Sequence, residues 1–422
     1  MECCSEHSPR TRREEEKIIT RRAFLKVSAG GLLLAGGARW VEFANAAGDS
    51  LPAGALESAQ LGSLPGKLPL IKKSFRPPNF ETPVAYFNDA FTPNRAFFVR
   101  YHLADIPQVD AARWKLAIAG ESTERPLELT YENLTRDFET VEVAAVCMCS
   151  GNRRGFSQPH VPGVQWGHGA IGNAQWRGVR LRDLLNKAGL RKDAVEIVLG
   201  GADGAVLEKT PDFVKSIPVW KAMDENTLVA FAMNGEKLPH WHGFPARIVV
   251  PGWTATYWMK HVTSISAVSQ PFKGFWMNPA YRIPKGKFPL IDRFISQETD
   301  ANTPITEMVV NSLITSPDNG RKIRQAEAVT VAGVAWDGGY GIATVEVSED
   351  EGKVWQTAQL GEDLGRYSWR QWSHRFTPAR SGRHAVLARA TNRAGATQTF
   401  ELIFNPAGYH NNVVQRVEIE AT

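Results

Sequence analysis

One stretch of the 422-residue chain gathers reactive side chains closely: Val146-Cys147-Met148-Cys149-Ser150-Gly151-Asn152-Arg153-Arg154-Gly155. It combines thiols, guanidinium groups and glycines that leave the backbone free to turn. An arginine beside a thiol favours the thiolate that a metal ion needs. Arginines also bind oxyanions through paired, charge-assisted hydrogen bonds. By itself the stretch fits a buried structural cysteine beside surface arginines slightly better than it fits a metal site.

The cysteines of this stretch need an explanation other than a disulfide. We expect Cys147 and Cys149, which are separated by one intervening residue on an extended segment, to point to opposite faces, so that a bond between them would be strained. Cys3 and Cys4 lie in an N-terminal segment that we expect to be removed. An exported protein that lacks a disulfide framework must use its remaining thiols in another way.

The N-terminus has the order of parts found in an export signal. The run 20–26 reads TRRAFLK, which is similar to the twin-arginine motif, and an apolar stretch, Val27–Ala38, follows it. That stretch is shorter than the ~20 residues that span a bilayer. Ala44-Asn45-Ala46 provides a cleavage site. We therefore predict a signal peptide over 1–46, no membrane span, a periplasmic location, and a prosthetic group inserted before export.

Composition excludes several classes of protein. Hydrophobic residues make up 43% and charged residues 22% of the chain, which is typical of a soluble globular protein. A net charge of +5, without basic runs interleaved with aromatics, gives no reason to expect nucleic acid as a partner. The chain has no Cys-x-x-Cys-His pattern for covalent haem. We expect no haem here, so that electrons must leave through another protein.

The pattern of short elements predicts two domains. Over 47–295, β-type runs such as Trp114–Ala119 and Val141–Val146 alternate with helical candidates, Tyr131–Arg136 and Leu181–Ala188, which indicates an α+β domain. The lead-in over 47–95 has little periodicity and is expected to wander over the surface.

Over 296–422 the pattern becomes all-β, with turn clusters between short runs. The spacing predicts an immunoglobulin-like sandwich. The expected strands are Met308–Leu313, Ala328–Trp336, Ile342–Ser348, Val354–Ala358, Trp369–Phe376, Gly382–Ala390 and Thr397–Phe404.

Longer motifs then extend from residue 97 to residue 409. They are Phe97–Leu103, Cys149–Asn152, Gly169–Gly178, His242–Arg247, Trp258–Lys260, Ala280–Pro284 and Asn405–Tyr409. Together they resemble the sulfite oxidase family of molybdenum enzymes, and within it the bacterial periplasmic sulfite dehydrogenases. The resemblance implies a molybdopterin-binding domain followed by a domain that supports dimerisation.

The resemblance also implies a cofactor and roles for particular residues. It implies molybdenum held by a single molybdopterin and one protein thiolate. Cys149 falls on the thiolate position, whereas Cys147 matches no role and is interpreted as a core residue. The substrate-pocket positions are Arg100, His102, Arg154 and Tyr281. The positions that hold the pterin and its phosphate are Phe98, Asp203, His242, Arg247 and Lys260, of which His242 fits a core histidine equally well.

The implied reaction is oxidation of sulfite to sulfate by oxygen-atom transfer, with a c-type cytochrome as electron acceptor. The assembly is either a homodimer or a heterodimer with a cytochrome subunit. One departure bears on the substrate: where bacterial relatives carry an arginine beyond the Asn405–Tyr409 motif, this chain has Asn411. We expect Asn411 to weaken sulfite binding or to change the substrate.

Other functions remain open from the sequence. Within the same superfamily, the alternatives are a sulfane-sulfur dehydrogenase and a reductase of oxidised methionine. A hydrolase that uses Cys149 as nucleophile lacks a local signature and leaves the export signal unexplained. A non-catalytic periplasmic binding protein would not explain why Cys, Arg and Lys fall on family positions throughout 97–282.

Overall fold

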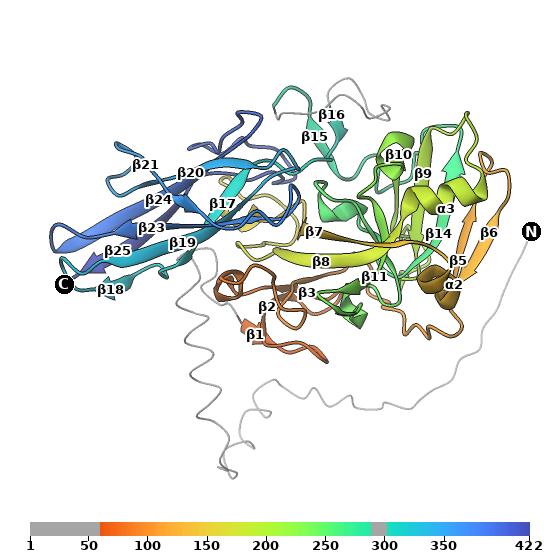
Figure 1. Ribbon diagram of the computed structural model, residues 1–422, viewed down its shortest axis with the longest axis horizontal. Coiled ribbons are helices and arrows are strands. Elements are labelled where there is room, and N and C mark those ends of the chain that lie inside the picture. Colours follow the sequence, from red (N-terminus) through yellow and green to blue (C-terminus); the bar gives the residue numbers. More distant parts are fainter. Residues whose placement is uncertain (1–59, 288–301) are drawn as a thin grey trace, which may run out of the picture. The chain divides into compact units, whose positions relative to one another are not determined.

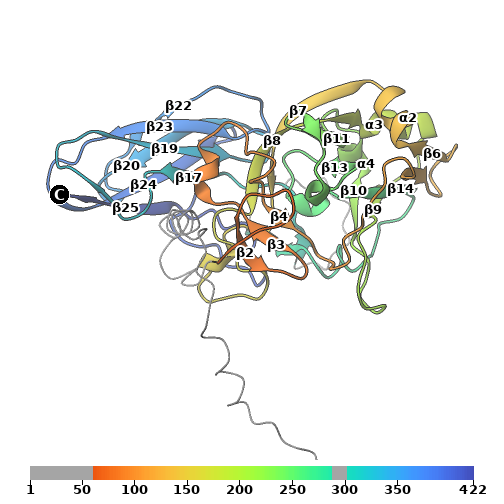
Figure 2. The same cartoon turned by 90° about the horizontal axis from the view of Figure 1, so that it is seen from below.

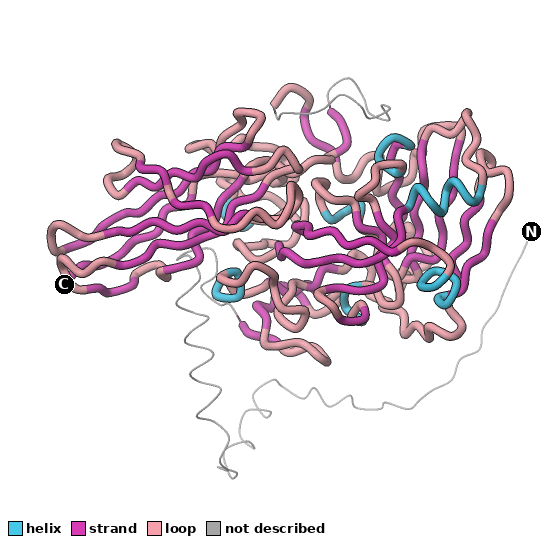
Figure 3. The backbone as a smooth tube through the Cα atoms, viewed as in Figure 1, coloured by secondary structure: helices cyan, strands magenta, loops and turns pink. Residues whose placement is uncertain are grey.

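The computed structural model describes residues 60–287 and 302–422, in which strands are the main regular structure and helices are few and short (Figures 1 and 3). We call 60–287 the first domain and 302–422 the second domain. By its internal contacts the chain divides into Met1–Phe43 and Ala44–Thr422, so every described residue lies in the second of these units. The twin-arginine motif, the cleavage site and the boundary expected near 295 lie outside the described residues.

The segment expected to wander over the surface forms a sheet instead. Its antiparallel strands are β1 (Gln60–Gly62), β2 (Leu70–Ser74), β3 (Asn79–Glu81) and β4 (Val99–Arg100), in that order, and Figure 2 shows β2, β3 and β4. Leu70, Phe80 and Val99 are buried in one cluster with Tyr101. The prediction was wrong because these strands are too short to show periodicity, and they are held by pairing with β4, which carries Arg100.

Two larger sheets form the rest of the first domain. One has the order β10-β9-β14-β5-β6, with a parallel pair between β14 and β5. The other has the order β12-β11-β8-β7, and β13 pairs with β11. The strands are β5 (Lys115–Ala119), β6 (Leu127–Thr130), β7 (Thr140–Met148), β8 (Ile171–Arg180), β9 (Glu196–Gly201), β10 (Val214–Pro218), β11 (Leu228–Met233), β12 (Glu236–Lys237), β13 (Arg247–Val249) and β14 (Val262–Val268).

The helices of this domain follow their local signals. Helix α2 (Tyr131–Arg136) begins at a capping box in which Thr130 and Asn133 bond reciprocally. Helix α3 (Leu181–Ala188) ends at Gly189, whose φ of 72° is the left-handed conformation that glycine tolerates. Both match the expected ranges. A third, shorter helix is α4 (Val219–Ala222).

The second domain consists of two sheets around one shared hydrophobic core. Val331 and Trp372 of one sheet pack with Val345, Val386 and Ile419 of the other. One sheet contains β17 (Asn311–Ser316), β19 (Val329–Trp336), β23 (Arg370–Phe376) and β22 (Gln359–Leu360). The other contains β18 (Arg321–Ile323), β25 (Gln415–Ala421), β24 (Gly382–Asn392), β20 (Ile342–Ser348) and β21 (Gln356–Thr357). The all-β character agrees with the sequence, and the immunoglobulin type stays a prediction.

One expected strand of this domain is wrong. Thr397–Phe404 is not a strand, and it makes only isolated bridges at Thr397 and Thr399. Phe400 is 54% exposed, so the alternation in this segment does not face the core. The position beside β24 is taken by β25, whose Val417, Ile419 and Ala421 alternate inward.

Strands β7 and β8 also pack against the second domain. Val146 and Met148 of β7 share a buried apolar cluster with Leu313, Val334 and Trp369 of the second domain. The amide of Val146 donates to the carbonyl of Tyr367 at 2.9 Å. The short pair β15 (Arg282–Pro284) and β16 (Asn302–Pro304) connects the same domains. The reactive stretch at the end of β7 therefore begins next to the junction of the two domains.

Candidate active site

Cys149 lies just after the end of β7, at the start of a tight turn. Its amide donates to the carbonyl of Ala170, and its carbonyl accepts from the amide of Asn152, each at 2.9 Å. A Cβ at Gly151 would lie 2.5 Å from the guanidinium of Arg154, so a larger residue there would displace that side chain. The turn thus places the thiol of Cys149 at the wall of a cavity.

Both thiols line this cavity, so the expectation that they face opposite ways is wrong. Residues two apart on a strand point to the same face, and this is how Cys147 and Cys149 are placed. Both are free cysteines. Burial raises the pKa of Cys147 to about 11, even though Arg247 and Lys260 act in the opposite direction. Cys147 is therefore a protonated thiol at neutral pH, and Cys149 is the better placed metal ligand because the turn presents it.

Distant segments of the first domain meet at the same cavity. Its wall includes every predicted site residue except Arg154, and these are Phe98, Arg100, His102, Cys149, Asp203, His242, Arg247, Lys260 and Tyr281. The lining also includes Tyr101, Phe213 and Trp241, which the sequence did not single out as site residues. Among the described residues, no group of three or more His, Cys, Asp or Glu side chains is arranged to hold a metal ion.

One end of the cavity carries neutral hydrogen-bonding groups. The ring of His102 stacks on Phe213 with centroids 3.7 Å apart, and its Nε2 is hydrogen-bonded to the hydroxyl of Tyr281. Burial, followed by the nearby charge of Arg100, lowers the pKa of His102 well below its usual value. Burial raises the pKa of Tyr281. The imidazole and the phenol are therefore both neutral near pH 7, and Tyr281 remains able to donate a proton in a hydrogen bond.

The other end of the cavity carries an excess of buried positive charge. Lys260 donates to the carbonyl of Arg100 at 2.7 Å, and Arg247 donates to the carbonyls of His242 and Trp258 at 3.2 and 3.1 Å. Burial lowers the pKa of Lys260. Asp203 is the carboxylate of this wall, and burial raises its pKa.

Buried charge that is not compensated costs several kcal/mol, so cations in excess of carboxylates favour an anionic occupant. A cavity with one well-placed thiol and several buried cations fits a metal–pterin group that carries a phosphate. Cys149 would hold the metal, and Lys260 with Arg247 would hold the phosphate.

His242 is fixed by a residue that sequence reasoning missed. Its Nε2 lies 2.6 Å from Nζ of Lys67, which also donates to the carbonyls of Asn94 and Phe97 at 2.6 and 2.7 Å. An ammonium has only donors, so Nε2 of His242 accepts and the proton is on Nδ1. His242 is thus both a hydrogen-bonded buried histidine and part of the cavity wall. No local signal in the lead-in segment marks Lys67.

Tyr101 and His261 form a second support that the sequence did not reveal. The ammonium of Lys260 lies over the ring of Tyr101, 2.8 Å from its centroid. The hydroxyl of Tyr101 and Nε2 of His261 are 2.8 Å apart, and Nδ1 of His261 is 2.7 Å from the carbonyl of Phe244. Since a carbonyl only accepts, Nδ1 carries the proton and Tyr101 donates to Nε2. This chain of contacts holds the aromatic face beneath Lys260.

Arg154 lies outside the cavity wall. Its Nε donates to the carbonyl of Ala407 at 2.8 Å and its Nη1 to that of Val164 at 3.1 Å. The guanidinium lies over the ring of Tyr409, at 5.3 Å from the centroid. Tyr409 in turn stacks on Tyr281 with centroids 5.7 Å apart. Arg154 thus reaches the cavity through two stacked rings.

The structure does not place Asn411 in the wall of the Cys149 cavity, and its expected effect on the substrate stays a prediction. Its side chain donates to the carbonyl of Arg153 at 3.1 Å and accepts from the amide of Val413 at 3.2 Å. It is buried, and it stabilises the loop around Arg153.

Both domains of the chain match known protein families. The family described as "Oxidoreductase molybdopterin binding domain" matches residues 102–276, and the family described as "Mo-co oxidoreductase dimerisation domain" matches residues 302–422. The mitochondrial sulfite oxidase of Rattus norvegicus is 33% identical over 362 residues, which cover 82% of this chain and 65% of that protein. That of Drosophila melanogaster is 32% identical, with 82% and 62% covered. The chain thus spans slightly less than two thirds of these relatives.

A solved structure shares the fold of nearly the whole chain. The sulfane dehydrogenase SoxCD from Paracoccus pantotrophus aligns with a TM-score of 0.72 and 24% identity, over 96% of this chain and 93% of that chain. In the part of the chain that the structure describes, no helix is long and apolar enough to cross a membrane.

Proposed function

Because the chain belongs to the sulfite oxidase family of molybdenum enzymes, we propose that it is a molybdopterin-dependent oxidoreductase that converts sulfite to sulfate. The observation that carries the proposal is the Cys149 cavity, where a presented thiol, buried cations and a neutral phenol meet. When bound, the metal–pterin group supplies oxygen-atom transfer and the storage of electrons. The chain's own residues supply binding, orientation and charge.

The two ends of the cavity divide these tasks. Arg100 provides the positive charge that attracts the oxygens of a small anion, and Tyr281 donates a hydrogen bond to the reacting oxygen. His102, bonded to Tyr281, orients the phenol. Arg154 acts through Tyr409 and adds positive charge behind the ring of Tyr281.

Lys260 and Arg247 hold the phosphate of the cofactor at the opposite end. These two residues have a different task from those at the substrate end. The charge of a bound cofactor phosphate must stay neutralised, whereas the substrate must be released after each reaction. Cys149, in the same cavity wall, would hold the metal. The low pKa of His102 keeps its ring neutral, so that it does not compete with Arg100 for the substrate.

A second candidate is oxidation of a sulfane sulfur. The observation that favours it is that Arg154 lies outside the cavity wall, which leaves Arg100 as the arginine that lines the cavity near Tyr281. Fewer cations suit a substrate that carries less negative charge than sulfite.

We further propose a periplasmic location, a c-type cytochrome as electron acceptor, and an assembly through the second domain. The twin-arginine motif supports the location, and the match of residues 302–422 to a dimerisation domain supports the assembly. Both a homodimer and a heterodimer with a cytochrome subunit are compatible with these observations.

The test uses full-length protein purified from a host that makes the cofactor. Molybdenum and pterin are quantified per chain, and sulfite-dependent reduction of cytochrome c is measured on the same sample. Stoichiometric metal with rapid reduction supports the proposal. Stoichiometric metal without reduction by sulfite, but with reduction by a sulfane-sulfur substrate, favours the second candidate. Absence of both metal and pterin would overturn both.

A further inference from the structure

A second cavity, of about 390 Å³, lies at the junction of the two domains, separate from the Cys149 cavity. Arg153, Phe156 and His168 line it from the first domain. The second domain contributes residues of 314–319 and 414–418. A smaller cavity of about 190 Å³ shares Arg153 and Phe156 with it and includes Asn411. Arg153 therefore stands between two hollows that no part of the proposed reaction uses.

Arg153 is a buried cation without a carboxylate partner. Its side chain is 5% exposed, its Nη1 donates to the side-chain oxygen of Asn311 at 3.0 Å, and its Nε has no hydrogen-bond partner. Among the described residues none forms an ion pair with Arg153 at 4 Å or less. Burial lowers its pKa to about 10. Asn311 is neutral, so it satisfies one donor but leaves the charge uncompensated.

His168 adds a second unsatisfied group on the same wall. Its Nδ1 is buried without a partner, and its ring packs against Phe156 with centroids 4.7 Å apart. Burial, and then the charge of Arg153, lower the pKa of His168 well below its usual value. A neutral imidazole that lines the cavity beside a guanidinium offers a hydrogen bond without adding further positive charge.

We propose that this junction cavity is a binding site for a small tetrahedral oxyanion, sulfate or phosphate, held by Arg153 and His168. The planar guanidinium matches the paired oxygens of such an anion. A bound anion would offset the desolvation cost of the buried charge, which a neutral partner such as Asn311 does not. The site is independent of the substrate oxidised in the Cys149 cavity.

The rim of the cavity sets the size of the ligand. Arg416, at the rim, is already paired with Glu418 and Glu351, at 2.5 and 2.8 Å. Asp318 and Glu418 also line the opening and repel a large polyanion. These charges favour a compact anion that reaches Arg153 over an extended one that would contact the rim.

An anion bound at this site would stabilise the turn that contains Cys149. Arg153 has a φ of 68°, a left-handed conformation that is unfavourable for a residue with a side chain. Its amide donates to the carbonyl of Gly167 at 2.8 Å, and its carbonyl accepts from Asn411. Since Arg153 follows Cys149 by one turn, an anion on its guanidinium stabilises the loop that presents the thiol.

The experiment locates the anion directly in full-length protein. Crystals grown in chloride are soaked in selenate, whose anomalous signal marks its position. We expect a peak within hydrogen-bonding distance of the Arg153 guanidinium, and an equivalent position for phosphate in a parallel soak. A peak confined to the Cys149 cavity, or none, overturns the proposal. Because this test needs no variant, it does not depend on the folding of a mutant.

Calorimetric titration with sulfate at constant ionic strength then measures which cation matters. Arg153→Met should weaken binding at this site about tenfold to a hundredfold, the amount expected for lost charge-assisted hydrogen bonds. Arg416→Met is the matched control at the rim, and it should change the affinity less than about twofold, because exposed ion pairs contribute little. Equal affinities of Arg153→Met and the unmodified protein would overturn the proposal, as would a larger loss in Arg416→Met.

Discussion

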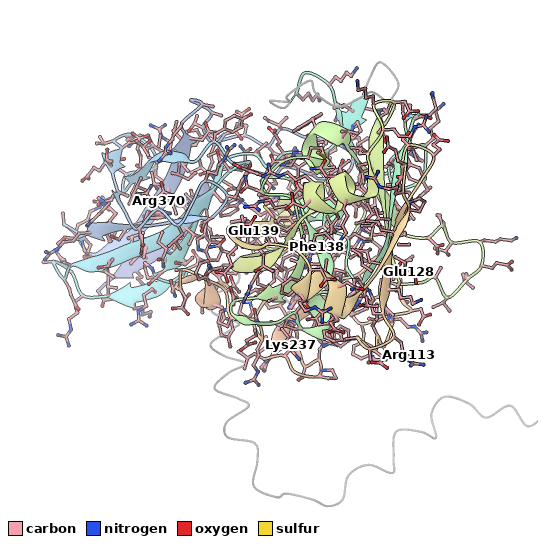
Figure 4. All side chains as sticks on the ribbon, turned by 45° about the vertical axis from the view of Figure 1, so that its right-hand side comes forward. Arg113, Glu128, Phe138, Glu139, Lys237 and Arg370 are labelled. Carbon is pink, nitrogen blue, oxygen red and sulfur yellow. The ribbon has the colours of Figure 1, made fainter. Side chains whose placement is uncertain are left out.

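Three buried lysines of the first domain differ in their contacts from two arginines of the second domain. In the first domain, Lys67, Lys215 and Lys260 are buried and contact carbonyls, aromatic rings and a histidine. In the second domain, Arg370 and Arg416 lie nearer the surface and pair with carboxylates, and Figure 4 labels Arg370 there. Buried cations without carboxylates cost stability, so Lys260 in the cavity wall favours an anionic ligand, whereas exposed ion pairs such as Arg416–Glu351 contribute little to stability.

The largest expected effect on activity comes from substituting the two thiols of the cavity wall. Cys149→Ser should lower kcat/KM by about 10⁴-fold or more, since a lost metal ligand costs more than the 10- to 100-fold typical of its supporting residues. Cys147→Ala, two residues away on the same wall, is the control and should retain activity within about threefold, because a small apolar side chain replaces a protonated thiol. Activity is measured per bound molybdenum. Comparable losses in both variants would mean that Cys149 has no special role.

A core substitution in the second domain should lower the stability of the protein without changing its catalytic rate. Trp372→Ala removes a side chain that is 2% exposed from the core shared by the two sheets. We expect the free energy of unfolding to fall by about 3–5 kcal/mol. At low temperature the turnover per molybdenum should be unchanged. Denaturant unfolding and a kinetic assay on the same sample check this, and a large fall in turnover of the folded variant would contradict the division between domains.

Acid should destabilise the protein through the buried histidines of the first domain. Burial lowers the pKa of His261 to about 3 and of His102, His168 and His242 well below 6.5. Between pH 6.5 and these lower values the unfolded chain binds more protons than the folded one, so the unfolding free energy decreases as pH decreases. The fall from pH 7 to pH 4 should be roughly 3 kcal/mol or more.

Asp203 opposes this trend, because its pKa is raised in the folded state. Unfolding curves in urea at several pH values measure the balance. A free energy of unfolding that stays level between pH 7 and pH 4 would show that the histidines are not kept neutral.

The smallest of these effects concerns the phosphate end of the cavity. Lys260→Met should reduce retention of the cofactor about tenfold to a hundredfold, as for other groups that orient a bound centre. Lys237→Met is the matched control: Lys237 is exposed on β12 and is labelled in Figure 4. Molybdenum and pterin per chain after extended dialysis measure the difference. An equal loss of molybdenum and pterin from the two variants would show that Lys260 does not hold the cofactor.

The sequence predicted helices and strands better than it predicted which residues contact one another across the fold. The helices α2 and α3, the strand before Cys149 and the all-β second domain follow from local periodicity and capping. The motifs also contain most of the residues that line the cavity, although Phe213 and Trp241 lie outside them. Lys67 could not be found, because its bond to His242 spans 175 positions and no local pattern records it.

The errors have the same origin. Thr397–Phe404 alternates like a strand, but β25 takes the place beside β24. Asn411 was placed at the substrate from its position after a motif, although its side chain bonds to Arg153. Avoiding either mistake would have required knowing which segments lie side by side in the folded chain. Local sequence patterns contain too little of that information.

The small sheet β1–β4 has a consequence for engineering. The recognised molybdopterin-binding segment begins at residue 102, yet Lys67 and Arg100, which belong to the site, precede it. A gene fragment cut at the recognised boundary would encode a cavity without one wall and His242 without its anchor. The smallest unit worth transplanting into another protein therefore starts upstream of β1, and grafts designed from the recognised segment alone should fail to retain the cofactor.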